Sequence, residues 1–252
     1  MEKKNEIQRV FNLIIIDESG SMSAIEKQAV SGLNETFQTI SAAQRNHEEQ
    51  EHYVSFVTFN SNGIKTVMNR HRVEPDKPIE WTDYVPDACT PLYDAMGQSI
   101  NELKEHVKDE DVVLVTIITD GMENASREFS GKDIKKLVSD MKEKGWVFAY
   151  IGTNQDVDAV ADSMGINSRM NYEYSQTGAD AMFDLERSKR KVFYCKLAKE
   201  GRDFMREKDY DFFKSDEDGK EGEAGEAPIA EKKQDDSDKP QSFWTKIKNL
   251  LD

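Results

Sequence analysis

The sequence predicts an α/β fold with a doubly wound, mostly parallel sheet of about six strands, one antiparallel edge strand and helices on both faces. Two observations lead to this prediction. Short apolar runs typical of buried strands alternate along the chain with longer segments whose apolar residues recur at helical spacing. Repeated strand–helix alternation requires right-handed crossovers between parallel strands, which place helices over both faces of the sheet.

The first half of the chain begins with the apolar run 10–16, which is typical of a buried parallel strand. Apolar residues from 23 to 44 then recur at helical spacing and predict the first helix. Residues 52–59 favour a strand, and a polar turn leads from them into 64–72. We expect this hairpin to supply the antiparallel edge strand.

The middle of the chain is punctuated by prolines, and residues 74–90 are expected to be irregular. A helix is predicted over 91–107, with Thr90 as its N-cap and Pro91 at its first position. A second strongly apolar run, 112–119, predicts another buried strand.

The second half continues the alternation. Ser130 and Asp133 form a capping-box pattern at the start of a helix that Gly145 would end. The aromatic and aliphatic residues that follow favour a buried strand, and Thr177 to Asp180 is expected to cap a final helix. The predicted helices cover 131–143, 156–164 and 177–200, and the predicted strands cover 146–151 and part of 166–174.

Composition divides the chain into three parts. Residues 1–205 are expected to form the α/β domain, because the strand and helix patterns end there. Residues 206–240 predict an acidic low-complexity linker that is disordered: its segment 215–238 carries ten acidic residues against three lysines. Residues 241–252 predict a short amphipathic helix.

Polar residues follow two of the buried strands at the point where each strand ends. Asp17, Ser19 and Ser21 come directly after the first apolar run, and Asp120 follows the run 112–119. In open α/β sheets, ligands bind at this carboxyl edge. Small hard cations such as Mg²⁺ prefer six oxygen ligands, so one loop with three oxygens needs further donors from elsewhere in the chain. Thr90 lies between the two strands in sequence and is a candidate donor.

Asp17, Ser19, Ser21, Thr90 and Asp120 together resemble the metal-ion-dependent adhesion site of von Willebrand factor type A domains. The resemblance rests on Asp-x-Ser-x-Ser after an isoleucine run, then Thr-Pro-Leu, then Thr-Asp-Gly at a strand end, and it covers roughly residues 7–200. It implies a Rossmann-like sheet and a site for Mg²⁺ or Mn²⁺. The hydroxyls of Ser19, Ser21 and Thr90 would bind the cation directly, and the two carboxylates partly through water.

The resemblance also implies a function. Few direct carboxylates leave the cation with residual positive charge, so an exposed Asp or Glu of a protein partner can complete its coordination. We therefore expect a metal-dependent protein-binding module, an intracellular adaptor or assembly factor of the prokaryotic type, and no enzyme. Two alternatives stay open: a metal-assisted phosphoester hydrolase, and an interaction scaffold that binds no metal.

Other features bound the partners and the location. The net charge of −15 argues against nucleic acid and against stable association with an anionic membrane. The sequence shows no signal peptide and no long apolar stretch, so a cytoplasmic location is expected. The four histidines are expected at the surface or at sheet edges, and the two cysteines as reduced thiols. The C-terminal segment is a possible docking peptide for a second partner or for the chain's own body, through Phe243, Trp244, Ile247, Leu250 and Leu251.

Overall fold

The computed structural model describes residues 7–153, 156–207 and 210–214. In these ranges six strands form one sheet in the order β3-β2-β1-β4-β5-β6. All neighbouring pairs are parallel except β2 and β3, so the hairpin supplies an antiparallel edge strand as predicted. The strands are β1 (Gln8–Asp17), β2 (Gln50–Asn60), β3 (Gly63–Arg72), β4 (Val112–Thr119), β5 (Val147–Gly152) and β6 (Ser168–Asn171).

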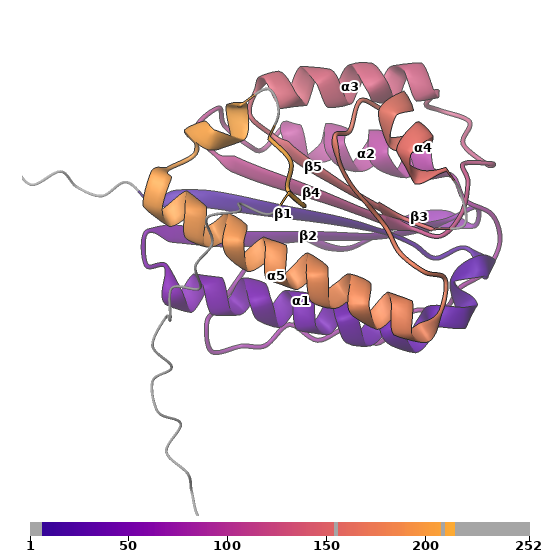
Figure 1. Cartoon of the computed structure of the whole chain (residues 1–252), viewed down its shortest axis with the longest axis horizontal. Helices are drawn as coiled ribbons and strands as arrows, with labels where there is room; N and C mark the ends of the chain where they lie inside the picture. The colour runs from indigo at the N-terminus through magenta and orange to yellow at the C-terminus, as the bar shows by residue number, and fades with distance from the viewer. Residues whose placement is uncertain (1–6, 154–155, 208–209, 215–252) are drawn as a thin grey trace, which may run out of the picture. The chain divides into compact units, whose positions relative to one another are not determined.

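Helices cover both faces of the sheet, which confirms the predicted α/β architecture. Figure 1 shows α1 and α5 side by side along one face, with α2, α3 and α4 on the other. The α-helices are α1 (Glu26–Asn46), α2 (Leu92–Lys104), α3 (Gly131–Glu143), α4 (Val157–Ser163) and α5 (Gln176–Glu200). Two short 3₁₀ helices, η1 (Gly20–Ile25) and η2 (Asp203–Arg206), precede α1 and follow α5.

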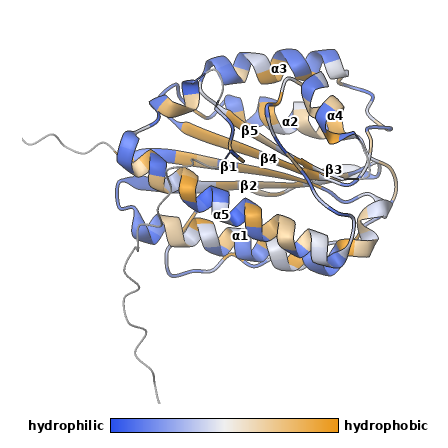
Figure 2. Cartoon of the chain, viewed as in Figure 1, coloured by the Kyte–Doolittle hydropathy of each residue, from blue (hydrophilic) through white to orange (hydrophobic). Residues whose placement is uncertain are grey.

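The hydrophobic core has two layers, one on each face of the sheet. Because side chains alternate along a strand, β1 sends Ile14 and Ile16 into the α1/α5 layer and Leu13 and Ile15 into the α2/α3/α4 layer. Figure 2 shows the central strands as almost uniformly hydrophobic, whereas the helices carry both kinds of residue. This explains why β1 and β4 appear in the sequence as continuous apolar runs.

One charged pair is buried inside the α1/α5 layer. The Arg190 guanidinium of α5 donates to Glu186, one turn earlier, and both side chains are at most 1% exposed. Arg190 also donates to Asn12 on β1 and to Thr116 on β4, at 3.1 and 2.8 Å. Tyr194 adds a hydrogen bond to Asn12 at 2.6 Å. The polar residue that interrupts the first apolar run is therefore an anchor for α5.

Three local sequence predictions need correction. Thr90 does not cap α2, because the helix begins at Leu92 and Pro91 is the preceding residue. The last helix is capped by the Ser175 side chain, which accepts from the Gly178 amide, and not by Thr177. His52 is not at the surface: its side chain is fully buried, with its ring edge-on to Tyr194.

Packing continues beyond α5. Gly201 ends this helix with a φ of +71°, and the chain then turns through η2 and does not extend the helix. Phe212 is buried against the α1/α5 layer, so residues 210–214 pack with the α/β unit although the linker was expected to start at 206. The expected C-terminal helix and residues 215–240 lie outside the described residues. No helix in the described ranges has the length and apolar character needed to cross a membrane.

Candidate metal centre

The parallel register of β1 and β4 brings the two aspartates to one edge of the sheet. Ile16 of β1 lies opposite Ile118 of β4, so the next residues, Asp17 and Thr119, leave the sheet side by side. The Thr119 hydroxyl donates to Asp17 Oδ2 at 2.6 Å, which ties the two strand ends together. Asp120 follows immediately and turns toward the loop between β1 and η1.

The loop after β1 places its two serine hydroxyls next to each other. Asp17 Oδ1 accepts a hydrogen bond from the Ser19 amide at 2.8 Å, which fixes the start of the turn. Ser19 Oγ and Ser21 Oγ are 3.2 Å apart. The Ser21 hydroxyl then donates a hydrogen bond to Asp120 Oδ1 at 2.7 Å. The loop after β1 is therefore in direct contact with the loop after β4.

The surroundings of Gly121 show that the loop before α2, which carries Thr90, reaches the same cluster. A Cβ built on this glycine would lie 3.0 Å from Thr90 Oγ1, 3.6 Å from Asp17 Oδ2 and 3.7 Å from Ser21 Oγ. Oxygens from the loops after β1 and before α2 therefore converge where the loop after β4 passes them. Together with the contact between Ser21 and Asp120, this brings all five sequence-predicted donors into one cluster.

The cluster is buried, with one side open to solvent. Asp17, Ser19, Thr90 and Asp120 are each at most 2% exposed, whereas Ser21 is exposed. Burial raises the pKa of Asp17 to about 6, although hydrogen bonds from Thr119 and Ser19 partly oppose the shift. Burial also raises the pKa of Asp120. Two carboxylates held in such surroundings favour a compensating positive charge.

The loop after β1 is held in place by a segment that the sequence predicted only as irregular. The Tyr84 hydroxyl donates to the backbone oxygen of Asp17. The Val85 amide donates to the Glu18 carboxylate at 2.8 Å, and the Asp87 amide donates to Glu18 O at 2.9 Å. Glu18, whose role the sequence left open, therefore fastens this segment to the site.

A second set of hydrogen bonds fixes the loop that carries Thr90. Asn124 Oδ1 accepts from the Thr90 amide at 2.9 Å, and the Asn124 amide donates to Thr90 O at 3.1 Å. Asp94 accepts from the amides of residues 127–129, and Glu123 accepts from the Tyr93, Ala125 and Ser126 amides. These residues position the backbone around the five candidate metal ligands and are not candidate ligands themselves.

The donor set fits a small, hard divalent cation. Asp120 Oδ2 is buried and, among the described residues, has no hydrogen-bond partner. An unpartnered buried carboxylate oxygen is costly, and a cation bound beside it, directly or through water, would remove that cost. In the described ranges no group of three or more His, Cys, Asp or Glu side chains could hold a metal ion. Two carboxylates and three hydroxyls are oxygen donors, which suit Mg²⁺ or Mn²⁺ better than softer metals.

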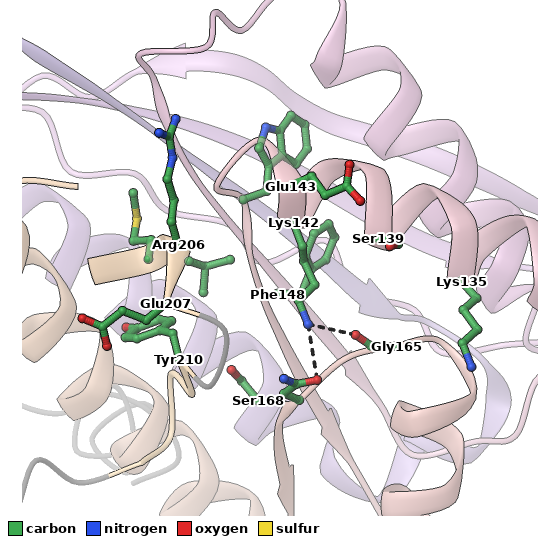
Figure 3. A pocket seen from close by; sticks show the side chains of 14 residues that line it. Lys135, Ser139, Lys142, Glu143, Phe148, Gly165, Ser168, Arg206, Glu207 and Tyr210 are labelled. Atoms are coloured by element: carbon green, nitrogen blue, oxygen red, sulfur yellow. Dashed lines mark hydrogen bonds between the residues drawn. The ribbon is translucent and has the colours of Figure 1, made fainter. Parts of the chain in front are cut away.

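One cavity adjoins this cluster, and a second lies at the opposite edge of the sheet. A groove of about 610 Å³ adjoins it and is lined by Cys89, Pro91, Asn124 and Arg127, among others. A cavity of about 500 Å³ lies at the opposite, amino-terminal edge of β5 (Figure 3). There the Lys142 amine donates to Gly165 O and to Asn167 Oδ1 at 3.1 and 3.3 Å, so it serves the protein's own carbonyls. Of these two cavities, only the first is lined by the residues on either side of Thr90.

Comparison with known proteins shows the fold and no more specific relationship. No family model matches the chain, and no curated protein matches it in sequence. Among solved structures, a von Willebrand factor type A protein from Catenulispora acidiphila aligns with 12% identity and a TM-score of 0.53. Proximal thread matrix protein 1 from the mussel byssus, with a zinc-occupied adhesion-site motif, aligns with 16% identity and a TM-score of 0.51. The corresponding domain of the type V pili tip protein Mfa5 from Porphyromonas gingivalis aligns with 10% identity and a TM-score of 0.53.

The extent of these alignments differs. The matched region covers 73% of this chain and 43% of the Catenulispora protein, and 71% of this chain and 47% of the mussel protein. It covers 75% of this chain and 97% of the Mfa5 domain. The chain thus spans less than half of the first two proteins and nearly all of an isolated domain. The chain has the von Willebrand factor type A fold, as the sequence motifs predicted.

Proposed function

We propose that this chain is a divalent-cation-dependent protein-binding module. The observation that carries the proposal is the convergence at Gly121 of oxygens from two loops, the one after β1 and the one before α2, with Asp120 of the loop after β4 joined to the same cluster through Ser21. The fold supports it, because a solved structure of similar fold is described with zinc in its adhesion-site motif.

Each of the five residues has a role in this proposal. Ser19, Ser21 and Thr90 would bind Mg²⁺ or Mn²⁺ through their hydroxyls. Asp17 and Asp120 would balance the charge of the cation, partly through bound water. The bound cation would supply residual positive charge and an accessible coordination position for an acidic side chain of the partner. The exposure of Ser21, beside four buried donors, supports an approach from this side.

Binding is favoured over catalysis by the position of the acid–base residues. Of the four histidines, His52 is buried in the core, His71 is on the edge strand β3, and His47 and His106 follow the ends of α1 and α2. None is a hydrogen-bond partner of the donor cluster in the described chain. We therefore propose a non-enzymatic role, as an adaptor or assembly factor. A cytoplasmic location and an acidic residue of a protein as the ligand are further parts of the proposal.

Calorimetric titration of the full chain with Mg²⁺ and with Mn²⁺ tests the metal assignment. We expect saturable binding to the wild type and none to the Ser19→Ala/Ser21→Ala variant, whose unfolding midpoint in chelator should be close to that of the wild type. The Ser139→Ala/Ser163→Ala variant is the matched control, because both serines are exposed on α3 and α4. Wild-type affinity in the first variant would refute the donor set. Absence of binding to the wild type would leave a metal-free scaffold.

The C-terminal segment is proposed as a second binding element. Its apolar residues lie outside the described residues, so the proposal rests on the sequence pattern alone. Pull-downs from native lysate with the full chain and with a chain truncated after residue 214, each in Mg²⁺ and in chelator, separate the two elements. A partner that is lost on truncation but kept in chelator would belong to the tail.

A further inference from the structure

Loops next to the candidate metal centre carry exposed apolar side chains. In the described ranges the large apolar side chains that are exposed are Ile7, Val85, Met122, Tyr174, Leu185 and Val192. Single exposed apolar residues are normal on a protein surface, whereas several together on one face indicate an interaction site. Three of the six, Val85, Met122 and Tyr174, either follow a residue of the candidate site directly in sequence or hydrogen-bond to the loop after β1.

Each of these three residues belongs to a different loop. Val85, 68% exposed, is fixed beside the site because its amide donates to the Glu18 carboxylate. Met122, 63% exposed, follows Gly121, on which the donor oxygens converge. Tyr174, 36% exposed, precedes α5, and its hydroxyl donates to the backbone oxygen of Ser21. We call Val85, Met122 and Tyr174 the apolar rim.

The rim does not serve the packing of this chain. Val85 and Met122 leave most of their side-chain surface in water, although the loops that carry them are held by the hydrogen bonds described above. Met and Tyr are enriched at protein interfaces, where a few well-packed residues provide most of the affinity. A buried charged centre with exposed apolar residues on three adjoining loops is therefore consistent with a protein-binding surface.

The surrounding charge restricts the kind of partner. Asp87 and Glu173 are exposed on the same loops as Val85 and Tyr174, whereas Asp83, which is also exposed there, lies 3.6 Å from the Lys65 amine. A partner with several acidic residues would be repelled by these carboxylates. A single acidic residue between apolar neighbours avoids that repulsion and uses both the centre and the rim.

We infer that the partner of this site presents one acidic residue flanked by apolar side chains, which pack against Val85, Met122 and Tyr174. The inference rests on the proposed metal-dependent function and adds the chemistry that selects the partner. In this proposal the acidic residue binds the cation, and the rim discriminates among partners that offer one.

A peptide-display selection tests the inference directly. The library carries one fixed aspartate with three random residues on each side, and it is selected on the immobilised full chain in Mg²⁺ with elution by chelator. We expect apolar residues to be enriched next to the aspartate. Synthetic versions of the selected peptides should bind Val85→Ser/Met122→Ser on the order of tenfold more weakly than the wild type.

Two controls separate the rim from general effects. Leu185→Ser/Val192→Ser makes the same kind of change at exposed apolar residues of α5 and should leave peptide affinity unchanged. Mg²⁺ titration should give wild-type affinity for both double variants. Tyr174 is left intact because its hydroxyl contacts the donor loop.

The possible results point in different directions. Metal-dependent peptides without apolar preference, or peptides that bind Val85→Ser/Met122→Ser as tightly as the wild type, would overturn the inference. So would an equal loss in the α5 variant. If Mg²⁺ binds but no peptide depends on it, the rim inference fails and the metal assignment stands. If the wild type binds no Mg²⁺, the proposed function fails, and this inference fails with it.

Discussion

Replacement of Gly121 by alanine perturbs the candidate metal centre with a single methyl group. The added Cβ would lie 3.0 Å from Thr90 Oγ1, closer than most carbon–oxygen contacts, so the hydroxyl must move by a few tenths of an ångström. Mg²⁺ requires ligands near 2.0–2.1 Å in nearly ideal octahedral geometry, and a displaced hydroxyl is therefore a poorer ligand. We expect Mg²⁺ affinity to fall on the order of tenfold, which corresponds to about 1.4 kcal/mol.

Thermal unfolding with and without Mg²⁺ measures this loss. At a Mg²⁺ concentration one hundred times the wild-type Kd, binding stabilises the wild type by about 2.7 kcal/mol, and a tenfold weaker site by about 1.4 kcal/mol. For a domain of this size, about 2–4 °C of Tm corresponds to each kcal/mol, so the Mg²⁺-induced Tm shift should be halved from roughly 5–11 °C.

Gly63→Ala is the matched control, because a Cβ there meets no atom within 4 Å. It should keep the full Mg²⁺ response. An undiminished Mg²⁺ response in Gly121→Ala would show that Thr90 does not contact the cation, and the reasoning from the converging oxygens would be wrong.

Three further predictions concern the core and the support of the site. Arg190→Met should destabilise the fold by about 3–5 kcal/mol in urea unfolding, because it leaves the Glu186 carboxylate buried without its partner, and adding Glu186→Leu should restore most of the loss. Burial lowers the pKa of His52 to about 3, so between pH 6.5 and 3 the unfolded chain binds a proton that the folded chain excludes. The free energy of unfolding should therefore fall as the pH drops through this range, by up to about 5 kcal/mol. His52→Met should flatten this part of the pH profile of unfolding. Thr119→Val removes the hydroxyl that donates to Asp17 and should weaken Mg²⁺ binding in calorimetry on the order of tenfold, and unchanged affinity would exclude a positioning role for Thr119.

The sequence was sufficient for the fold and for placing Asp17 and Asp120 at one edge of the sheet, because both depend on local patterns. The apolar runs of β1 and β4 identify buried strands, and a residue that directly follows such a run must lie at the carboxyl edge of a parallel sheet. The positions of Asp17 and Asp120 therefore follow from the strand assignment alone. The third loop was predicted from its resemblance to a known motif, since nothing in the local pattern of residues 74–90 places Thr90 near the other donors.

What the sequence could not provide are contacts that only the packed chain creates. The hydroxyls of Tyr84 and Tyr174 reach the loop after β1 from 67 and 153 residues away. His52 looked like an edge residue of a strand, and only the arrival of α5 over the sheet buries it beside Tyr194. The prediction that Thr90 caps α2 was wrong for a related reason: the Thr90 amide donates to the Asn124 side chain and the Thr90 carbonyl accepts from the Asn124 amide, contacts that the local capping pattern does not reveal.

Because of the same long-range contacts, we expect that the donor residues can be changed without loss of the fold. Backbone hydrogen bonds to Glu18 and Asn124 hold the loops on either side of the site, and these bonds do not involve the donor hydroxyls of Ser19, Ser21 or Thr90. The loops are thus positioned by the protein, and the donors are presented in a fixed arrangement, which lowers the entropy cost of binding a cation. A substitution at a donor hydroxyl should therefore remove cation binding with little effect on unfolding, whereas Asn124→Ala should impair both, because it leaves the Thr90 amide without its acceptor.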